Sequence, residues 1–172
     1  IGSLSLISYT PVAVDKFESE NATASEMQEQ SSQESDRYIF LTLGNESFAI
    51  SLEIAREIIF VPQNITPISE AGYGVMGMIT LRDELITALD LKQVINVPPK
   101  AQLSELEQKE RRLLILNYAE KSVALLVDGI NEVKDIDTNL IEKLPERFAD
   151  SKVEAVYKEE QQLVSLVSLT YL

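Results

Sequence analysis

Cysteine and histidine are both absent from this chain of 172 residues. Without cysteine there is no disulfide, thiolate ligand or cysteine nucleophile. Without histidine the chain lacks the commonest metal ligand and the side chain whose ordinary pKa best suits acid–base catalysis near neutral pH. These absences favour a protein that is not an enzyme and that uses no metal or other cofactor.

Long apolar runs are also missing. No stretch approaches the roughly 20 residues that a membrane helix requires, so we predict a soluble protein without direct membrane insertion. The net charge is −13 and the 15 Lys and Arg residues are scattered, which argues against nucleic acid as a partner. The chain is 45% hydrophobic, and its length suits one domain with a real core, or two small subdomains.

The first 36 residues differ in composition from the rest. From Asp15 to Asp36 the chain is rich in Glu, Ser and Gln, with Phe17 and Met27 as the only larger apolar side chains. We predict a tail or linker over residues 1–36, with a candidate strand at 4–9 where apolar and polar residues alternate, and a folded domain over 37–172. The first residue is Ile1 rather than Met, which favours a piece of a longer polypeptide, and no secretion signal is evident.

After residue 36 the pattern is mostly β. Short apolar runs between turn residues predict strands at 38–43, 48–50, 75–81, 84–89, 113–118, 122–127, 130–136, 153–157 and 162–167. The runs 113–118 and 122–127 are apolar on both faces, which indicates the centre of a sandwich or barrel. We also predict a helical turn leading into a strand before Pro62, a short helix at 91–95, a mobile polar connection over 96–111, and a loop with one helical turn over 138–148.

Arg82 and Asp83 join two of the predicted strands in a tight turn. A guanidinium at the tip of such a turn presents five N–H donors, which suits it to a carboxylate or carbonyl of a binding partner. Two alternatives remain: a solvated turn arginine, or an internal ion pair with a nearby carboxylate.

Two possible chemical sites are weaker. Four side chains have the spacing of a calcium-binding loop: Asp135, Asp137, Asn139 and Glu146. Leu140 stands where that loop needs Gly, so we interpret the segment as a solvated loop and predict no metal site. The adjacent carboxylates of Asp83 and Glu84 lie on a predicted exposed turn that would not separate their pKa values, and we predict no catalytic residue.

Several of these segments, taken in order, resemble the CheW-like chemotaxis coupling proteins. They are Phe40-Leu41-Thr42-Leu43-Gly44, the run from Phe48 to Ile58, Thr80-Leu81-Arg82-Asp83, and Val127-Asp128-Gly129-Ile130-Asn131-Glu132-Val133. The resemblance covers roughly residues 38–172. It implies a mainly β fold of two intertwined, small, five-stranded β-barrels (SH3-like subdomains) that share a core and carry short helices.

The resemblance implies an adaptor or scaffold of bacterial chemosensory signal transduction. Such a protein couples the signalling tip of a methyl-accepting chemoreceptor to the regulatory domain of a CheA-type histidine kinase, in the cytoplasm at membrane-associated receptor arrays. Three alternatives stay open: an accessory CheW-like array protein or pilus-system adaptor, the regulatory CheW-like end of a larger signalling enzyme, and a β-barrel sensor with a polar-lined ligand cavity.

The resemblance also implies partner-binding residues around the turn. Leu81 and Arg82 match an Asn-Leu-Arg-Gly motif that is linked to receptor and kinase coupling. Thr80 and Asp83 replace its Asn and Gly, which changes both the turn and the charge offered to a partner.

Further candidates lie before and after the turn. Ala55 and Glu57 match Val-x-Glu positions where an apolar groove meets receptor helices, with a core-facing role as the alternative for Ala55. Asp128-Gly129 resembles a structural Val-Asp-x-Val motif in which Gly129 would serve a turn. Glu132 follows it as the sixth candidate contact, after Arg82, Leu81, Asp83, Ala55 and Glu57.

Overall fold

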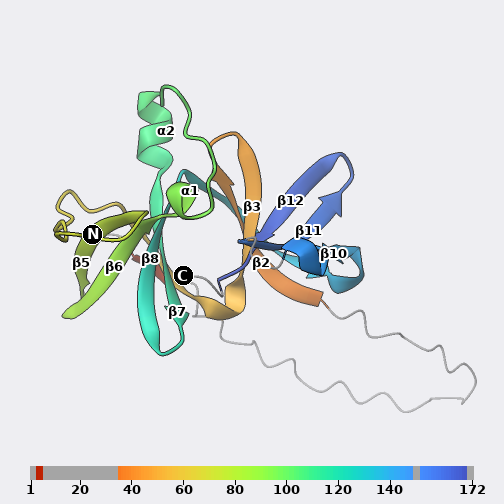
Figure 1. Ribbon diagram of the computed structural model, residues 1–172, viewed down its shortest axis with the longest axis horizontal. Helices are drawn as coiled ribbons and strands as arrows, with labels where there is room; N and C mark the ends of the chain where they lie inside the picture. The colour runs from red at the N-terminus through yellow and green to blue at the C-terminus, as the bar shows by residue number, and fades with distance from the viewer. Residues whose placement is uncertain (1–2, 6–34, 149–151, 170–172) are drawn as a thin grey trace, which may run out of the picture.

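A computed structural model describes residues 3–5, 35–148 and 152–169, and the strands of these residues form two six-stranded sheets (Figure 1). The first sheet, in the order β1-β4-β7-β8-β6-β5, consists of β1 (Ser3–Ser5), β4 (Ala55–Phe60), β5 (Val75–Leu81), β6 (Glu84–Asp90), β7 (Arg112–Tyr118) and β8 (Lys121–Val127). The second sheet, in the order β10-β11-β12-β3-β2-β9, consists of β2 (Ser35–Leu43), β3 (Glu46–Ser51), β9 (Gly129–Asp137), β10 (Ile141–Lys143), β11 (Val153–Glu159) and β12 (Gln162–Val167).

The chain passes between the sheets more than once. It leaves the second sheet after β3, builds the first sheet from β4 to β8, and returns with β9, where β9 pairs with β2. The predicted mainly β fold of two intertwined units is confirmed. Each sheet has six strands rather than the predicted five, because the three-residue strands β1 and β10 extend the edges by pairing with β4 and β11.

The largest apolar cluster lies between the two sheets and contains side chains from both. This central cluster comprises Ile39, Leu41, Leu43, Phe48, Ile50, Ala55, Ile58, Leu89, Leu91, Val94, Val97, Leu114, Leu116, Leu125, Val127, Val167 and Leu169. Side chains on β7 alternate between this cluster and one inside the first sheet, which holds Leu113 and Ile115. The predicted two-sided burial of these strands is therefore confirmed, and the shared core binds the two sheets together.

A separate cluster fills the curve of the second sheet. It comprises Tyr38, Phe40, Ala49, Ile136, Ala155, Tyr157, Val164 and Leu166, with Ile141 packed against it. The rings of Phe40 and Tyr157 meet edge to face with centroids 6.1 Å apart. We call this group the second-sheet cluster, because one end of it forms the pocket discussed below.

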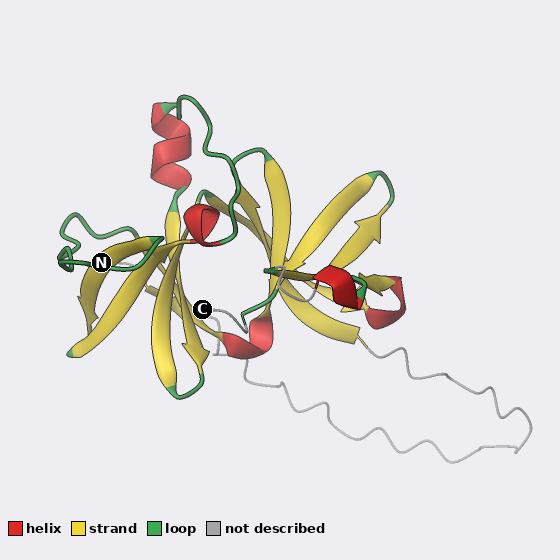
Figure 2. Ribbon diagram, viewed as in Figure 1, coloured by secondary structure: helices red, strands yellow, loops and turns green. Residues whose placement is uncertain are grey.

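Short helical segments connect the strands of the described residues (Figure 2). They are η1 (Leu52–Ile54), α1 (Leu91–Val94), α2 (Glu105–Glu110), η2 (Thr138–Leu140) and η3 (Glu146–Phe148). The predicted mobile polar connection over 96–111 contains α2, which the sequence analysis did not predict. Ser104 and Glu107 form a capping box that satisfies the first N–H groups of this helix. The predicted loop over 138–148 contains β10 in addition to its helical turns.

The outer edge of β5 is met by the segment that follows β4. The N–H of Thr66 donates to the carbonyl of Met78 at 2.9 Å, and the N–H of Met78 donates back to the carbonyl of Thr66 at 2.7 Å. Gly77 permits this approach, because a Cβ at that position would lie 2.2 Å from the Thr66 carbonyl oxygen and its φ is +146°. The contact pairs the outer edge of β5 with the segment that follows β4.

Candidate functional site

The turn between β5 and β6 contains only Arg82 and Asp83, because Leu81 pairs directly with Glu84. Arg82 has φ 49° and Asp83 has φ 66°. Two successive positive φ values define the two-residue hairpin turn whose twist matches that of the strands. Aspartate tolerates this conformation, whereas arginine adopts it at some cost, so other contacts must hold Arg82 in place.

Those contacts come from Glu57 on β4. Arg82 Nη1 donates to Glu57 Oε1 at 2.6 Å and Nη2 donates to Oε2 at 2.8 Å, so the guanidinium and carboxylate meet as two forks. The Glu57 side chain is 3% exposed and that of Arg82 is 56% exposed. These hydrogen bonds to Glu57 raise the pKa of the Arg82 guanidinium above its ordinary value. The internal ion pair that the sequence left as an alternative is therefore present.

A second arginine extends this pair across the sheet. Arg56 Nε lies 3.6 Å from Glu57 Oε1, and Arg56 Nη1 donates to Glu84 Oε2 at 2.6 Å and to Ser122 Oγ at 3.1 Å. The register of β4 against β7 shifts between Ala55 and Glu57, which marks a bulge next to Arg56. Hydrogen bonds from Ser122 and then Arg56 lower the pKa of Glu84. We call Arg82, Glu57, Arg56 and Glu84 the arginine–glutamate network.

The six predicted partner-binding residues fall into two groups. Arg82, Leu81, Asp83 and Glu57 come together at the turn, where Leu81 is half-buried against the first-sheet cluster and Asp83 is exposed. Ala55 is 4% exposed and packs in the central cluster. It therefore takes the core-facing position that was its alternative interpretation.

The other outlying candidate, Glu132, lies on β9 of the second sheet, where it is 3.5 Å from Lys134 Nζ. Sequence reasoning overlooked Arg56 and Glu84. The available signal was their position in the sequence: Arg56 and Glu84 are charged residues directly next to the predicted site residues Glu57 and Asp83.

Asp128 lies between β8 of the first sheet and β9 of the second, and it contacts both units. Its Oδ2 accepts from the N–H of Gly44, 2.7 Å away in the turn between β2 and β3. Its Oδ1 is 2.5 Å from Lys92 Nζ on α1, and Arg111 Nε lies 3.9 Å away. The prediction that Gly129 serves a turn is wrong, because its φ is not in the left-handed region and a Cβ there would meet nothing within 4 Å.

Two of the residues with calcium-loop spacing make contacts within the protein. Asp137 caps η2 by accepting from the N–H of Asn139 at 2.9 Å, and Asp135 pairs with Arg37 at 2.9 Å. Among the described residues no three His, Cys, Asp or Glu side chains are grouped to hold a metal ion. Within the same residues no helix has the length and apolar composition needed to cross a membrane.

Comparison with known proteins decides the family. Residues 37–172 match the family of CheW-like domains. The chain belongs to the CheW-like domain family. The predicted family is thus confirmed, and the matched range spans the β5–β6 turn.

Known relatives of this CheW-like protein are chemotaxis proteins. It is 26% identical to chemotaxis protein CheW of Bacillus subtilis over 132 residues, which are 75% of this chain and 80% of the relative. It is 21% identical to chemotaxis protein CheW of Helicobacter pylori over 155 residues, 89% and 90% of the two chains. These names agree with the prediction of a chemotaxis adaptor.

A solved structure supports the fold. The scaffolding protein TtCheW from Thermoanaerobacter tengcongensis superposes with a TM-score of 0.68 at 24% sequence identity, covering 79% of this chain and 90% of that one. The two-sheet arrangement of this CheW-like protein is therefore that of a known CheW scaffold.

Proposed function

We propose that this CheW-like protein is a non-catalytic scaffold of chemotaxis signalling that couples chemoreceptors to a CheA-type histidine kinase at membrane-associated receptor arrays. The match of residues 37–172 to the CheW-like domain family carries this proposal. The names of the curated relatives, all chemotaxis proteins, support the pathway. The scaffold would act by geometry: it holds receptor and kinase together so that a shift in one changes the conformational equilibrium of the other.

The turn at Arg82 is the partner-binding surface that we assign. Glu57 fixes the orientation of a guanidinium whose side chain is 56% exposed. A fixed guanidinium loses less rotational freedom on binding than a mobile one, so it can engage a carboxylate or carbonyl at lower entropic cost. Leu81 and Asp83 flank it, and the negative charge of Asp83 favours a carbonyl over a carboxylate as the group that Arg82 binds.

Two fragments test the proposal when they are used separately: the regulatory domain of a CheA-type kinase and the signalling tip of a methyl-accepting receptor. We expect this protein to bind both. Arg82→Glu should weaken binding to at least one fragment by tenfold or more, since a favourable interface contact becomes a repulsive one (a tenfold change is about 1.4 kcal/mol in binding). Binding of neither fragment would overturn the proposed function.

Arg37→Glu is the matched control for Arg82→Glu. Arg37 is 54% exposed and pairs with the exposed Asp135 on the second sheet, so the control reverses the same kind of charge elsewhere. Equal loss of binding in both variants would show a general charge effect and would remove Arg82 from the site. Melting curves of Arg82→Glu and of Arg82→Lys, which keeps the charge, separate a loss of binding from a loss of folding.

One observation favours a second candidate within the same class. Asp83 stands where the family motif has Gly, and it takes a positive φ of 66° in the turn. This departure suits an accessory array protein or a pilus-system adaptor with a different partner preference. Asp83→Gly distinguishes the two, because it should strengthen binding to a standard receptor fragment only if the departure tunes the choice of partner.

A further inference from the structure

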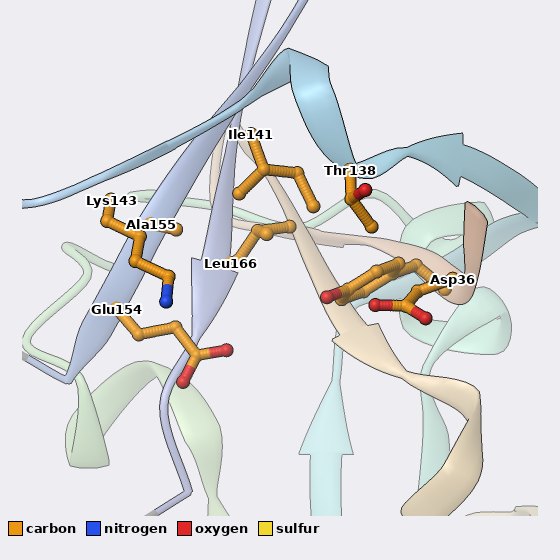
Figure 3. A pocket seen from close by; sticks show the side chains of 8 residues that line it. Asp36, Thr138, Ile141, Lys143, Glu154, Ala155 and Leu166 are labelled. Atoms are coloured by element: carbon orange, nitrogen blue, oxygen red, sulfur yellow. The ribbon is translucent and has the colours of Figure 1, made fainter. Parts of the chain in front are cut away.

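A pocket of about 540 Å³ opens at one end of the second sheet, away from the arginine–glutamate network (Figure 3). Its walls come from segments far apart in the sequence: β2, β10, β11 and β12. The side chains that matter here are Asp36, Tyr38, Ile141, Lys143, Glu154 and Leu166. Because the fold brings these segments together, no local motif marks the pocket.

The floor of the pocket is apolar and its rim is charged. Leu166 belongs to the second-sheet cluster and Ile141 packs against it. In Figure 3 the carboxylates of Asp36 and Glu154 lie on opposite sides of the pocket, below Ile141 and Leu166 in the view, with Lys143 on the side of Glu154. A ligand that fits must therefore have an apolar stem and polar groups directed to both sides.

The two carboxylates belong to exposed residues, and the charge of Lys143 acts on Glu154. Among the described residues, neither Asp36 nor Glu154 makes a side-chain hydrogen bond or ion pair, and Lys143 makes none either. By contrast, the carboxylate of Glu57 on the first sheet accepts hydrogen bonds from both Nη1 and Nη2 of Arg82. Partial burial raises the pKa of Glu154, and the charge of Lys143 opposes that effect.

A tyrosine hydroxyl adds a further polar group to the pocket. Tyr38 is 8% exposed, lines the pocket, and has no hydrogen bond from its hydroxyl among the described residues. Burial, and then the charge of Asp36, raise the pKa of Tyr38, so the group remains a protonated donor. The hydroxyl is not among the fully buried atoms without a partner, so it is open to the pocket, where a ligand can accept from it.

We propose that this pocket binds an arginine side chain presented by a partner protein. The guanidinium would donate to Asp36 and Glu154, and its five-donor fork suits two separated carboxylates better than the single ammonium of lysine. The arginine methylenes would cover Ile141 and Leu166, and a backbone carbonyl of the same segment would accept from the Tyr38 hydroxyl. This site goes beyond the proposed function, since it lies on the other sheet from Arg82 and does not depend on which partner Arg82 contacts.

Titration of the full chain with N-acetyl-arginine N-methylamide, followed by NMR, tests this. A ligand of this size should bind with a Kd on the order of 1–10 mM and shift the methyl resonances of Ile141 and Leu166. N-acetyl-citrulline N-methylamide has nearly the same shape without the charge and should not bind measurably. Glu154→Gln, Asp36→Asn and Tyr38→Phe keep the side-chain shapes, and each should weaken binding by about fivefold or more.

Glu142→Gln is the matched control, because Glu142 is an exposed carboxylate on β10 between the two pocket residues Ile141 and Lys143. Its side chain points to the other face of the strand, so binding should be unchanged. Equal weakening by Glu142→Gln would reveal mere attraction to the acidic chain and would overturn the site. Equal binding of the citrulline analogue, or of N-acetyl-lysine N-methylamide as a second control ligand, would also overturn the site. So would chemical-shift changes confined to residues outside the pocket. If one pocket variant fails to fold, the other two decide.

Discussion

Lys92 Nζ lies 2.5 Å from Asp128 Oδ1, with the two side chains 8% and 9% exposed. Lys92 belongs to α1, which follows β6 of the first sheet, whereas the second oxygen of Asp128 accepts from Gly44 in the turn between β2 and β3 of the second sheet. One buried carboxylate therefore connects the two units by charge and by hydrogen bond. The central cluster supplies apolar area at the same junction, and Asp128 adds directional contacts to it.

Asp128→Ala should lower the free energy of unfolding by about 3–5 kcal/mol, because it leaves the Lys92 ammonium buried without its partner. It also removes the acceptor of the Gly44 N–H. Urea denaturation measures the loss. Asp135→Ala is the control, since it removes an exposed carboxylate paired with an exposed arginine and should change stability little. Equal effects of the two variants would contradict the role of Asp128.

Removing Arg82 should lower the melting temperature more than removing Glu57. Arg82→Met leaves a carboxylate that is 3% exposed, with Arg56 Nε 3.6 Å away as its remaining cation. Glu57→Gln instead leaves an exposed guanidinium that water can solvate. The double variant should therefore melt higher than Arg82→Met alone. Thermal denaturation checks the order, and strictly additive effects would show that the two side chains are not coupled.

Gly77→Ala should destabilise the protein by about 2–3 kcal/mol, because the new Cβ would collide with the Thr66 carbonyl and the residue would be strained at its positive φ. The pairing of Thr66 with Met78 should be lost first, which hydrogen exchange of these two amides would detect. Gly129→Ala serves as the control, since a Cβ there meets nothing within 4 Å. A mild effect at Gly77 would mean that the edge of β5 does not need this contact.

Helix α2 should weaken in acid. A hydrogen bond from Lys100, and further ones from the backbone and hydroxyl of Ser104, lower the pKa of Glu107 from 4.5 to about 2. A lowered folded-state pKa means that the contribution to helix stability is fully present above pH 4.5 and is lost as the pH falls through about 2. NMR titration of the carboxyl group should give that midpoint.

Glu107→Gln should remove the acid dependence of hydrogen exchange in α2. Glu105→Gln removes the same charge from the same first turn without touching the capping box, and should leave the dependence in place. A Glu107 midpoint near the ordinary value of 4.5 would contradict this account.

Local patterns in the sequence were sufficient to predict most of the strands. The turn at Arg82 and Asp83 lies where it was predicted, and the two-sided apolar run of β7 is buried on both faces. Both signals depend only on neighbouring residues, since strand periodicity and turn chemistry are short-range properties. The capping box of α2 was also local, and a closer search for a Ser followed three residues later by Glu would have found it.

Only the tertiary structure decided which distant residues meet. The parallel pairs β6–β8 and β3–β12, the ion pair of Arg82 with Glu57, and the pocket beside Tyr38 all join segments that are separated in sequence. The burial of Ala55 likewise depended on the central cluster. A local pattern fixes which face of a strand is apolar, but it does not specify the strand on the other side. The pairing of distant strands depends on how well the apolar faces of all the strands pack together in the folded protein.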